Sequence, residues 1–467
     1  MKKLFASAVL ITGIGLGVIC AQTTPAVTTS IPYSDVKPIV QALREDLLPA
    51  ELRGRTSDER EALWSAWVSR SDAAIRGRVQ QGDEDSLINL LLFGTTFTKA
   101  SRPSQRDLAA LAVQPDEALR SLKARIEDFV AAVVSPGTNE RMQFARQVIT
   151  HKGIDPNTEA GRNQVRRFLE ERTRIVGASS IVQSSRLLGS DAELRDTLTL
   201  FRDRGLSADT SIFIDHGIDQ ALEGIKAKGL IQPATVRRVA IVGPGLDFSD
   251  KLEGYDFYAP QTIQPFAVVD SLIRFGLARP GELQVAAFDL SPRVIQHLET
   301  ARDRARAGKS YAVVLPRNLD RPWTPTLVKY WEGFGDRIGQ PTKAASPPSS
   351  AGRVEVRSVL IRPSVVLSTI PRDLNIVLQR LEPLSAGDQF DLILATNILL
   401  YYDVFEQSLA IANVAKMLRP GGIFLSNNRL FEFPAGPISA VGYTDAIYMQ
   451  LAGIGETGDR IVWYQRQ

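Results

Sequence analysis

Apolar residues recur at helical spacing through the first half of the chain. One apolar stripe begins at Val36, where Asp35 can cap the helix that carries it. Thr56 and Glu59 stand three residues apart ahead of a second stripe, which is the pattern of a capping box. Further helices are expected over residues 86–93, 116–134, 139–150 and 158–175. The pattern predicts an all-α domain over residues 22–205, and no motif in it indicates a chemistry.

From about residue 206 onward, short apolar runs alternate with amphipathic segments. The expected strands are residues 239–242, 283–288, 354–361, 390–395 and 422–426. The expected helices are residues 215–227, 265–277, 292–307, 375–381 and 404–418, the last with Asp403 and Glu406 as its capping box. This alternation is typical of a mostly parallel sheet with helices on both faces.

The end of the chain departs from the alternation. Residues 445–450 and 460–465 are strand-like, and the glycine-rich stretch between them is too short for a helix. Two strands that are joined so closely must run antiparallel. The expected fold is therefore an α/β domain over residues 206–467, with a doubly wound, mostly parallel seven-stranded sheet that ends in an antiparallel hairpin, preceded by the all-α domain.

Composition excludes several classes of function. The 467 residues are enough for two or three domains, and 44% apolar with 23% charged residues is typical of a soluble globular protein. The 55 basic and 52 acidic residues nearly balance, and no basic cluster interleaves with aromatic residues, so no nucleic-acid partner is expected. The single cysteine, Cys20, and three widely separated histidines predict neither a disulfide nor a metal site.

The first 21 residues have the pattern of a secretory signal peptide. Lys2 and Lys3 precede an apolar run over residues 4–21, and a polar stretch follows it. Cleavage would leave an exported protein, either periplasmic or secreted. The alternative is an uncleaved anchor, because the run just reaches spanning length, and residues 4–21 would then be the sole contact with a membrane. A cytoplasmic location is the second alternative.

The first expected strand of the α/β domain runs into the stretch VAIVGPGLDF. Gly243 and Gly245 allow either an ordinary tight turn or a close approach of the backbone to a ligand. Asp289 ends the second expected strand at the same edge of the sheet, where it can accept hydrogen bonds from a ribose. Its alternative role is to cap the helix that begins at Pro292, although Ser291 can cap that helix equally well.

A nicotinamide cofactor is disfavoured. The dinucleotide fingerprint requires a third glycine where this chain has Phe248, and Asp289 comes much later than the usual ~20 residues after the loop. The lysine-containing phosphate loop is absent from the sequence as well. The glycine loop must therefore serve another ligand or none.

Four stretches together resemble the class I S-adenosylmethionine-dependent methyltransferases. They are VAIVGPGLDF, VAAFDLSPRVIQHL, FDLILATNILLYY and MLRPGGIFLSNN, and the terminal hairpin agrees with them. The stretch TNILLYY is also similar to the chemotaxis-receptor branch of that family. The resemblance covers about residues 215–467. It implies S-adenosylmethionine as the cofactor and methyl transfer to an unknown acceptor, either a small molecule or a protein.

The resemblance also implies roles for individual residues. Loop residues would pass under the methionine and ribose of the cofactor, an aspartate would hold the ribose, and the leucine after it would touch the adenine. The residues concerned are Gly243, Pro244, Gly245, Asp247, Asp289 and Leu290. Asn397 would lie near the methyl group and the amino-acid end of the cofactor. Tyr401 and Tyr402 would orient the acceptor or face the cation, the alternative being simple packing at a helix start.

Three features depart from the family pattern. Ile241 stands where the family has an acidic residue, two positions before the first glycine. One insertion, containing YDFYAPQTIQ, follows the glycine loop, and another occupies about residues 308–353; both are expected to shape the acceptor side. Ile241 and the leader favour an alternative function, a non-catalytic methyltransferase-like binding module of an exported protein, because the cofactor is made in the cytoplasm.

Overall fold

The structure is a computed structural model that describes residues 26–103, 107, 110–111, 114–185, 205–249, 253–427, 429–430, 436–451 and 455–467 of the chain. The expected leader peptide at residues 1–21 lies outside the described residues. Within the described ranges, none of the helices combines the length and the apolar character needed to span a membrane.

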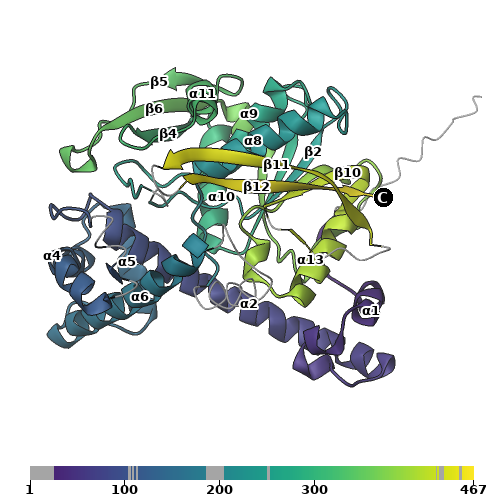
Figure 1. The fold of residues 1–467 in the computed structure, drawn as a ribbon, viewed down its shortest axis with the longest axis horizontal. Helices are drawn as coiled ribbons and strands as arrows, with labels where there is room; N and C mark the ends of the chain where they lie inside the picture. Colours follow the sequence, from purple (N-terminus) through teal and green to yellow (C-terminus); the bar gives the residue numbers. More distant parts are fainter. Residues whose placement is uncertain are drawn as a thin grey trace, which may run out of the picture.

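A seven-stranded sheet forms the centre of the molecule, with the strand order β11–β12–β10–β9–β2–β3–β7 (Figure 1). Its strands are β2 (Arg238–Val242), β3 (Gln284–Asp289), β7 (Thr369–Asp373), β9 (Phe390–Leu394), β10 (Leu418–Ser426), β11 (Ile438–Leu451) and β12 (Gly455–Arg466). Neighbours from β7 to β10 pair in parallel, whereas β12 runs antiparallel to both β10 and β11. The mostly parallel sheet and its terminal hairpin are therefore confirmed.

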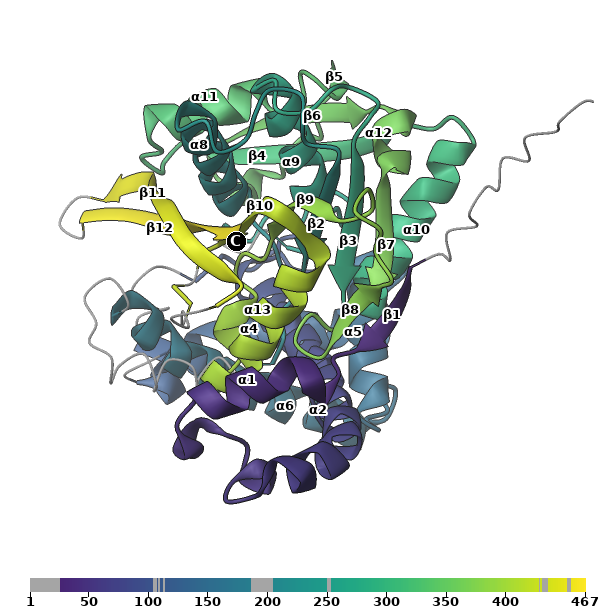
Figure 2. The ribbon, with the colours of Figure 1, turned by 90° about the vertical axis from the view of Figure 1, so that its right-hand side faces the viewer.

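Helices cover both faces of this sheet (Figure 2). They are α8 (Ile212–Ala227), α9 (Gln264–Arg274), α10 (Pro292–Arg306), α12 (Pro363–Ser368) and α13 (Val404–Met417). Val239 and Ile241 of β2 enter a core with α8 and α9, whereas Ala240 and Val242 enter a second core with α13. Because both faces are buried, β2 is apolar along almost its whole length, as parallel strands usually are.

The segment expected to insert at about residues 308–353 belongs to a small lobe outside the central sheet (Figure 1). The lobe is a three-stranded antiparallel sheet, in the order β4–β6–β5, together with one helix. Its elements are β4 (Tyr311–Asn318), α11 (Pro325–Gly333), β5 (Gly339–Thr342), η4 (Ser349–Ala351) and β6 (Val354–Ile361). Residues 354–361 were expected as the third strand of the central sheet, which is wrong. They pair with β4 along their full length, and periodicity does not identify a strand's partner.

The third parallel strand is β7 instead, and the helix expected at residues 375–381 is wrong as well, because β8 (Gln379–Glu382) lies there. β7 has the sequence TIPRD and forms an edge of the sheet. Proline cannot donate a hydrogen bond to a neighbouring strand and is tolerated at an edge, so Pro371 fits this place. A short strand with Pro371 and two exposed charged residues has no apolar run by which the sequence would reveal it.

The first half of the described chain is helical, apart from β1 (Val27–Ser30), which pairs with β8. Its helices are α1 (Tyr33–Ala42), η1 (Glu45–Leu47), η2 (Ala50–Leu52), α2 (Ser57–Phe93), α4 (Pro115–Val134), α5 (Glu140–His151) and α6 (Glu159–Ser185). The helix expected at residues 86–93 is the end of α2. The cap expected at Asp35 is wrong, because α1 begins at Tyr33, after Pro32 and without a side-chain cap, so Asp35 lies in its first turn.

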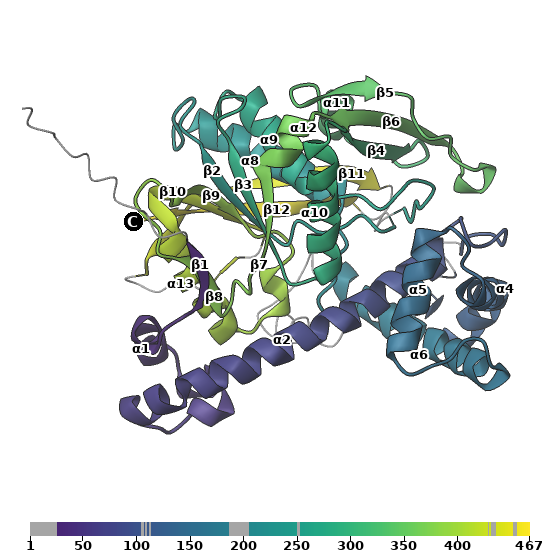
Figure 3. The ribbon, with the colours of Figure 1, turned by 180° about the vertical axis from the view of Figure 1, so that it is seen from behind.

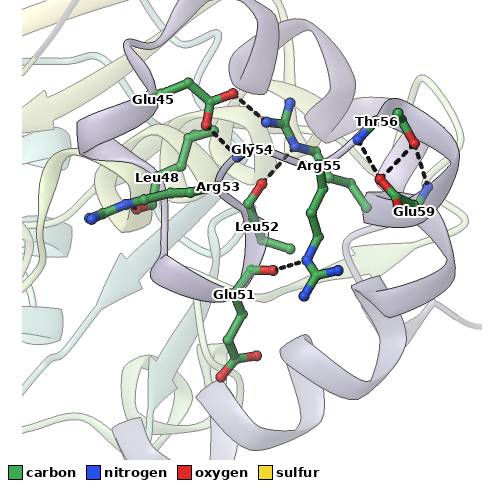
Figure 4. A network of polar contacts seen from close by, with 10 residues as sticks. Glu45, Leu48, Glu51, Leu52, Arg53, Gly54, Arg55, Thr56 and Glu59 are labelled. Atoms are coloured by element: carbon green, nitrogen blue, oxygen red, sulfur yellow. Dashed lines mark hydrogen bonds and ion pairs between the residues drawn. The ribbon is translucent and has the colours of Figure 1, made fainter.

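Helix α2 begins at the capping box expected from Thr56 and Glu59 (Figure 4). The Thr56 hydroxyl accepts a hydrogen bond from the Glu59 N–H at 3.4 Å, and the Glu59 carboxylate accepts one from the Thr56 N–H at 2.7 Å. In the preceding turn, the Glu45 carboxylate accepts hydrogen bonds from the Gly54 N–H at 3.1 Å and from Arg60 at 2.5 Å. These contacts fix the residue at which the long helix starts.

Helix α2 packs into two hydrophobic cores. Trp64, Trp67 and Ile75 belong to the core on the α13 face of the sheet, whereas the five apolar residues between positions 87 and 92 belong to the core of α4, α5 and α6. Figure 3 shows α2 running from α1 to these three helices along one side of the α/β part. The domain boundary expected near residue 205 stays a prediction.

Candidate functional site

The carboxyl ends of β2, β3 and β9 lie at one edge of the sheet, where the strand order reverses. The chain passes from β2 to β3 and β7 on one side and returns to β9 and β10 on the other. In open α/β sheets, ligands bind beyond the strands at such a point. Gly243 follows β2, Asp289 ends β3 and Asn397 follows β9. The Gly243 N–H donates to the Phe288 carbonyl at 2.7 Å, and Gly243 lies against Ile398, so the three loops are in contact.

Both glycines of the loop have left-handed backbone conformations, with φ of 67° at Gly243 and 71° at Gly245. A Cβ atom on Gly243 would lie 2.2 Å from Ile398 Cδ1, and one on Gly245 would lie 2.7 Å from the Ala208 carbonyl oxygen. The chain itself therefore fills the space beside both glycines. The loop needs glycine for its turn and its packing, whether or not a ligand binds.

We expect Gly245→Ala to lower the melting temperature of the ligand-free chain. The left-handed conformation costs a non-glycine residue roughly 1–2 kcal/mol, and the new Cβ would also meet a backbone oxygen that cannot rotate away. Gly229→Ala is the matched control, because Gly229 has a φ of 67° but nothing within 4 Å of the position of its Cβ. Comparing the loss of melting temperature in the two variants separates the cost of the left-handed conformation from the cost of the contact made by the new Cβ. Equal losses would contradict a packing role for Gly245.

Asp289 carries a buried carboxylate oxygen without a hydrogen-bond partner among the described residues. Its Oδ1 accepts from the Ser291 N–H at 2.8 Å, whereas Oδ2 has no partner at hydrogen-bond geometry within the described ranges. Burial raises the pKa of Asp289 to about 6, although the backbone N–H groups of Ser291, Leu290 and Gly245 and the charge of Arg293 act in the opposite direction. A buried acceptor without a partner is costly, so a ligand hydroxyl that donates to Oδ2 would be bound favourably.

Asp289 does not cap α10, which was the alternative role that the sequence allowed for it. Ser291 occupies the cap position, but its side chain makes no cap hydrogen bond, and its hydroxyl is buried without a partner in the described part of the chain. Asp289 binds the N–H of Ser291 itself rather than an N–H of the first turn of the helix. One oxygen of Asp289 therefore orders the turn, and the other is left for a ligand.

Asn397 stands just beyond β9 in a left-handed conformation, with a φ of 58°. Its backbone N–H donates to Asn427 Oδ1 at 2.7 Å, and Asn427 Nδ2 donates to Asn397 Oδ1 at 2.6 Å. Asn427 follows β10, so this pair joins two neighbouring loops of the edge. Asn427 was not among the expected site residues, although its place directly after the strand expected at residues 422–426 indicates this edge of the sheet.

Tyr401 and Tyr402 are buried at the end of the short helix η5 (Leu399–Tyr401). The Arg78 guanidinium lies 5.6 Å from the centre of the Tyr402 ring, and Arg78 Nη2 donates to the Tyr401 carbonyl at 2.7 Å. Burial raises the pKa of the Tyr402 phenol above its usual range. Both tyrosines belong to the core on the α13 face of the sheet, an environment typical of packing side chains.

Asp247 is held within the segment that follows the glycine loop. Its Oδ2 accepts from the Tyr258 hydroxyl at 2.8 Å and from the Gln261 amide at 2.9 Å. These contacts fold the insertion containing YDFYAPQTIQ back onto the loop, so the structure gives Asp247 a part in shaping the loop. Of the other two residues that the resemblance implied, Pro244 is buried and Leu290 is half-buried beside Asp289.

Helix α2 contributes side chains to this edge, and none of them was among the expected site residues. Arg78 contacts the loop after β9, as described above. Asp83 forms an ion pair with Arg293 at the start of α10, with a distance of 3.1 Å between Oδ1 and Nη2. The Ser86 hydroxyl donates to Asp209 at 2.9 Å, just ahead of α8. The helical half therefore forms part of the surroundings of the candidate site.

No group of three or more His, Cys, Asp or Glu side chains within the described ranges could hold a metal ion. Asp215, in the first turn of α8, is almost completely buried, and burial raises its pKa to about 8. The arrangement offers hydrogen-bond acceptors and donors for a polar organic ligand.

No family model matches this chain. No curated protein matches it either. Similar solved structures include magnesium protoporphyrin IX methyltransferase from Synechocystis PCC 6803 with bound SAM, at 10% identity and a TM-score of 0.25, covering 55% of this chain and 81% of that one.

Two further structures are comparably distant. The N-methyltransferase NodS from Bradyrhizobium japonicum WM9 is 13% identical with a TM-score of 0.24, covering 53% of this chain and 96% of that one. The glycopeptide N-methyltransferase MtfA, complexed with (S)-adenosyl-L-methionine, is 11% identical with a TM-score of 0.20, covering 53% and 77%. At these scores, the likeness determines nothing about the activity of this chain.

Proposed function

We propose that this chain binds S-adenosylmethionine at the carboxyl edge of its central sheet and transfers the methyl group to an acceptor. The observation that carries the proposal is Asp289 Oδ2, a buried acceptor oxygen that no described group of the protein satisfies, at the end of the second strand and beside the glycine loop. A ribose hydroxyl is the donor that the sequence resemblance assigns to this aspartate. The parallel strands and terminal hairpin support the same family.

Methyl transfer depends more on how the protein positions the reacting groups than on acid–base chemistry. S-adenosylmethionine supplies, when bound, a sulfonium methyl group that an acceptor can displace in line. The protein must hold that methyl group and the acceptor in one line, which is a matter of orientation and electrostatics. Asp289 would hold the ribose, and Asn397 lies at the opposite side of the switch point, where it would meet the amino-acid end. Side chains of α2, among them Arg78 and Asp83, contact the loops of the same edge and would lie near the acceptor.

We expect the purified chain to bind S-adenosylmethionine and S-adenosylhomocysteine with micromolar-range affinity, roughly 7–9 kcal/mol of binding free energy. Titration calorimetry measures the affinity, and a ligand-induced rise in melting temperature checks it independently. NAD, which also contains an adenosine ribose, is the control and should not bind, because the dinucleotide fingerprint is absent. Neither heat nor a thermal shift at millimolar S-adenosylhomocysteine would contradict the proposal and favour a binding module that has lost the cofactor site.

A further inference from the structure

The amide orientations of Asn397 and Asn427 follow from one backbone group. The N–H of Asn397 can only donate, so the Asn427 atom that it contacts at 2.7 Å is the carbonyl oxygen. The other end of the Asn427 amide is then its NH2 group, and the Asn397 atom that this group contacts at 2.6 Å is an oxygen in turn. The hydrogen-bond pattern thereby assigns nitrogen and oxygen in both side chains.

This pairing decides what Asn397 offers to a ligand. Its Oδ1 is turned toward Asn427, and among the described residues its Nδ2 donates to no protein group. The side chain is exposed at the switch point of the sheet, where a ligand is expected. Two unused N–H donors can bind a carboxylate, whose oxygens only accept, and they cannot bind an ammonium group, which only donates.

We propose that Asn427 is a positioning residue that turns the amide N–H groups of Asn397 toward the ligand, where they bind the carboxylate at the amino-acid end of the cofactor. This inference rests on the proposed S-adenosylmethionine site. The left-handed conformation of Asn397 is compatible with it, because asparagine adopts this conformation more readily than most residues and surrounding contacts can hold it. The hydrogen bond from the Asn397 N–H to Asn427 is such a contact.

Two ligands separate the carboxylate from the rest of the cofactor. S-adenosylhomocysteine has the amino-acid end, whereas 5′-methylthioadenosine keeps the adenine and the ribose and lacks it. Asn397→Gly removes the amide and tolerates the left-handed backbone. Asn427→Ala removes both hydrogen bonds to Asn397. Titration calorimetry of the native chain, the two single variants and the double variant with both ligands, each at a temperature where the variant is folded, tests the proposal.

Each single change should weaken S-adenosylhomocysteine binding roughly tenfold to a hundredfold, the usual effect of losing a hydrogen bond to a charged group. The affinity for 5′-methylthioadenosine should not change. The double variant should bind S-adenosylhomocysteine as Asn397→Gly does, because Asn427 acts through Asn397. Asn427→Asp should weaken it at least as much, since the new carboxylate would turn the Asn397 amide around and present its oxygen to the ligand.

Equal losses for both ligands, or an unchanged affinity for S-adenosylhomocysteine, would overturn the inference while leaving the proposed function in place. A double variant that binds more weakly than either single variant would show that Asn427 acts on its own, and would overturn its positioning role. A native chain that binds neither ligand would overturn the proposed function, and this inference with it.

Discussion

Asp289→Asn is expected to weaken S-adenosylmethionine binding by roughly tenfold to a hundredfold while leaving the fold almost unchanged. The substitution keeps the oxygen that accepts from the Ser291 N–H and replaces the buried, unpartnered Oδ2 by an NH2 group. An NH2 group cannot accept the hydrogen bond of a ribose hydroxyl. The expected loss is about 1.5–3 kcal/mol of binding free energy, because the acceptor in the native chain is charged. Titration calorimetry on the folded variant measures it.

Ser291→Ala is the matched control for Asp289→Asn. The Ser291 hydroxyl is buried close to Asp289 and has no partner within the described part of the chain, so its loss should leave the affinity near the native value.

The pH dependence of S-adenosylmethionine binding gives a second test of the role of Asp289. The pKa of Asp289 is about 6 without ligand, so the affinity should be constant above that pH and fall as the pH drops through it, because the protonated carboxyl is neutral. Asp289→Asn should lack this decline, and a native-like affinity in that variant would contradict the ribose-binding role.

Asp215→Asn is expected to stabilise the chain, increasingly so as the pH rises. Asp215 is 1% exposed, and neither oxygen of its carboxylate has a hydrogen-bond partner among the described residues. Burial raises its pKa from 3.8 to about 8, with Gln264 acting in the opposite direction. Between those values the folded chain retains a proton that the unfolded chain releases, so the free energy of unfolding falls as the pH rises through this window. Asparagine does not titrate, so the variant should not lose stability in this pH window through residue 215.

The gain from Asp215→Asn should be near zero at about pH 4 and reach on the order of several kcal/mol at about pH 8, since each unit of pKa shift corresponds to about 1.4 kcal/mol. Asp219→Asn is the control. Asp219 is also buried in α8, but its carboxylate accepts from the Ser271 hydroxyl at 2.5 Å and pairs with Arg274, so this change should destabilise. Melting temperatures across the pH range measure both variants. Parallel curves for native chain and Asp215→Asn would contradict the argument.

The parts of the fold that could be predicted from the sequence depend on local pattern. The capping boxes at Thr56 and Asp403 start helices where expected, because their hydrogen bonds join residues three positions apart. The β11–β12 hairpin follows from a short, glycine-rich connection. The partners of strands were not predictable in this way. β6 is a strand as expected but pairs with β4 outside the central sheet, and Pro371 in β7 is tolerated because β7 lies at an edge.

The candidate site also has parts that follow from local sequence pattern and parts that depend on contacts between distant segments. Gly243, Asp289 and Asn397 could be expected to meet, because they follow strands whose carboxyl ends share an edge. The partner of Asn397 could not be predicted, because the Asn427 contact depends on the left-handed turn at Asn397. Arg78 approaches the edge from α2, far away in the sequence, and only the packing of α2 on the sheet brings it there. Contacts of that kind leave no local pattern.

Helix α2, with its 37 residues, couples the stability of the two parts of the molecule that it joins. Because its two ends are embedded in different cores, neither α4, α5 and α6 nor the α/β part can lose its packing without fraying a helix that the other requires. A ligand that bound at the carboxyl edge of the folded chain alone would also oppose the opening of α4, α5 and α6, which it would not touch. The linkage would be reciprocal, so that loosening α4, α5 or α6 would lower the affinity of the carboxyl edge for that ligand.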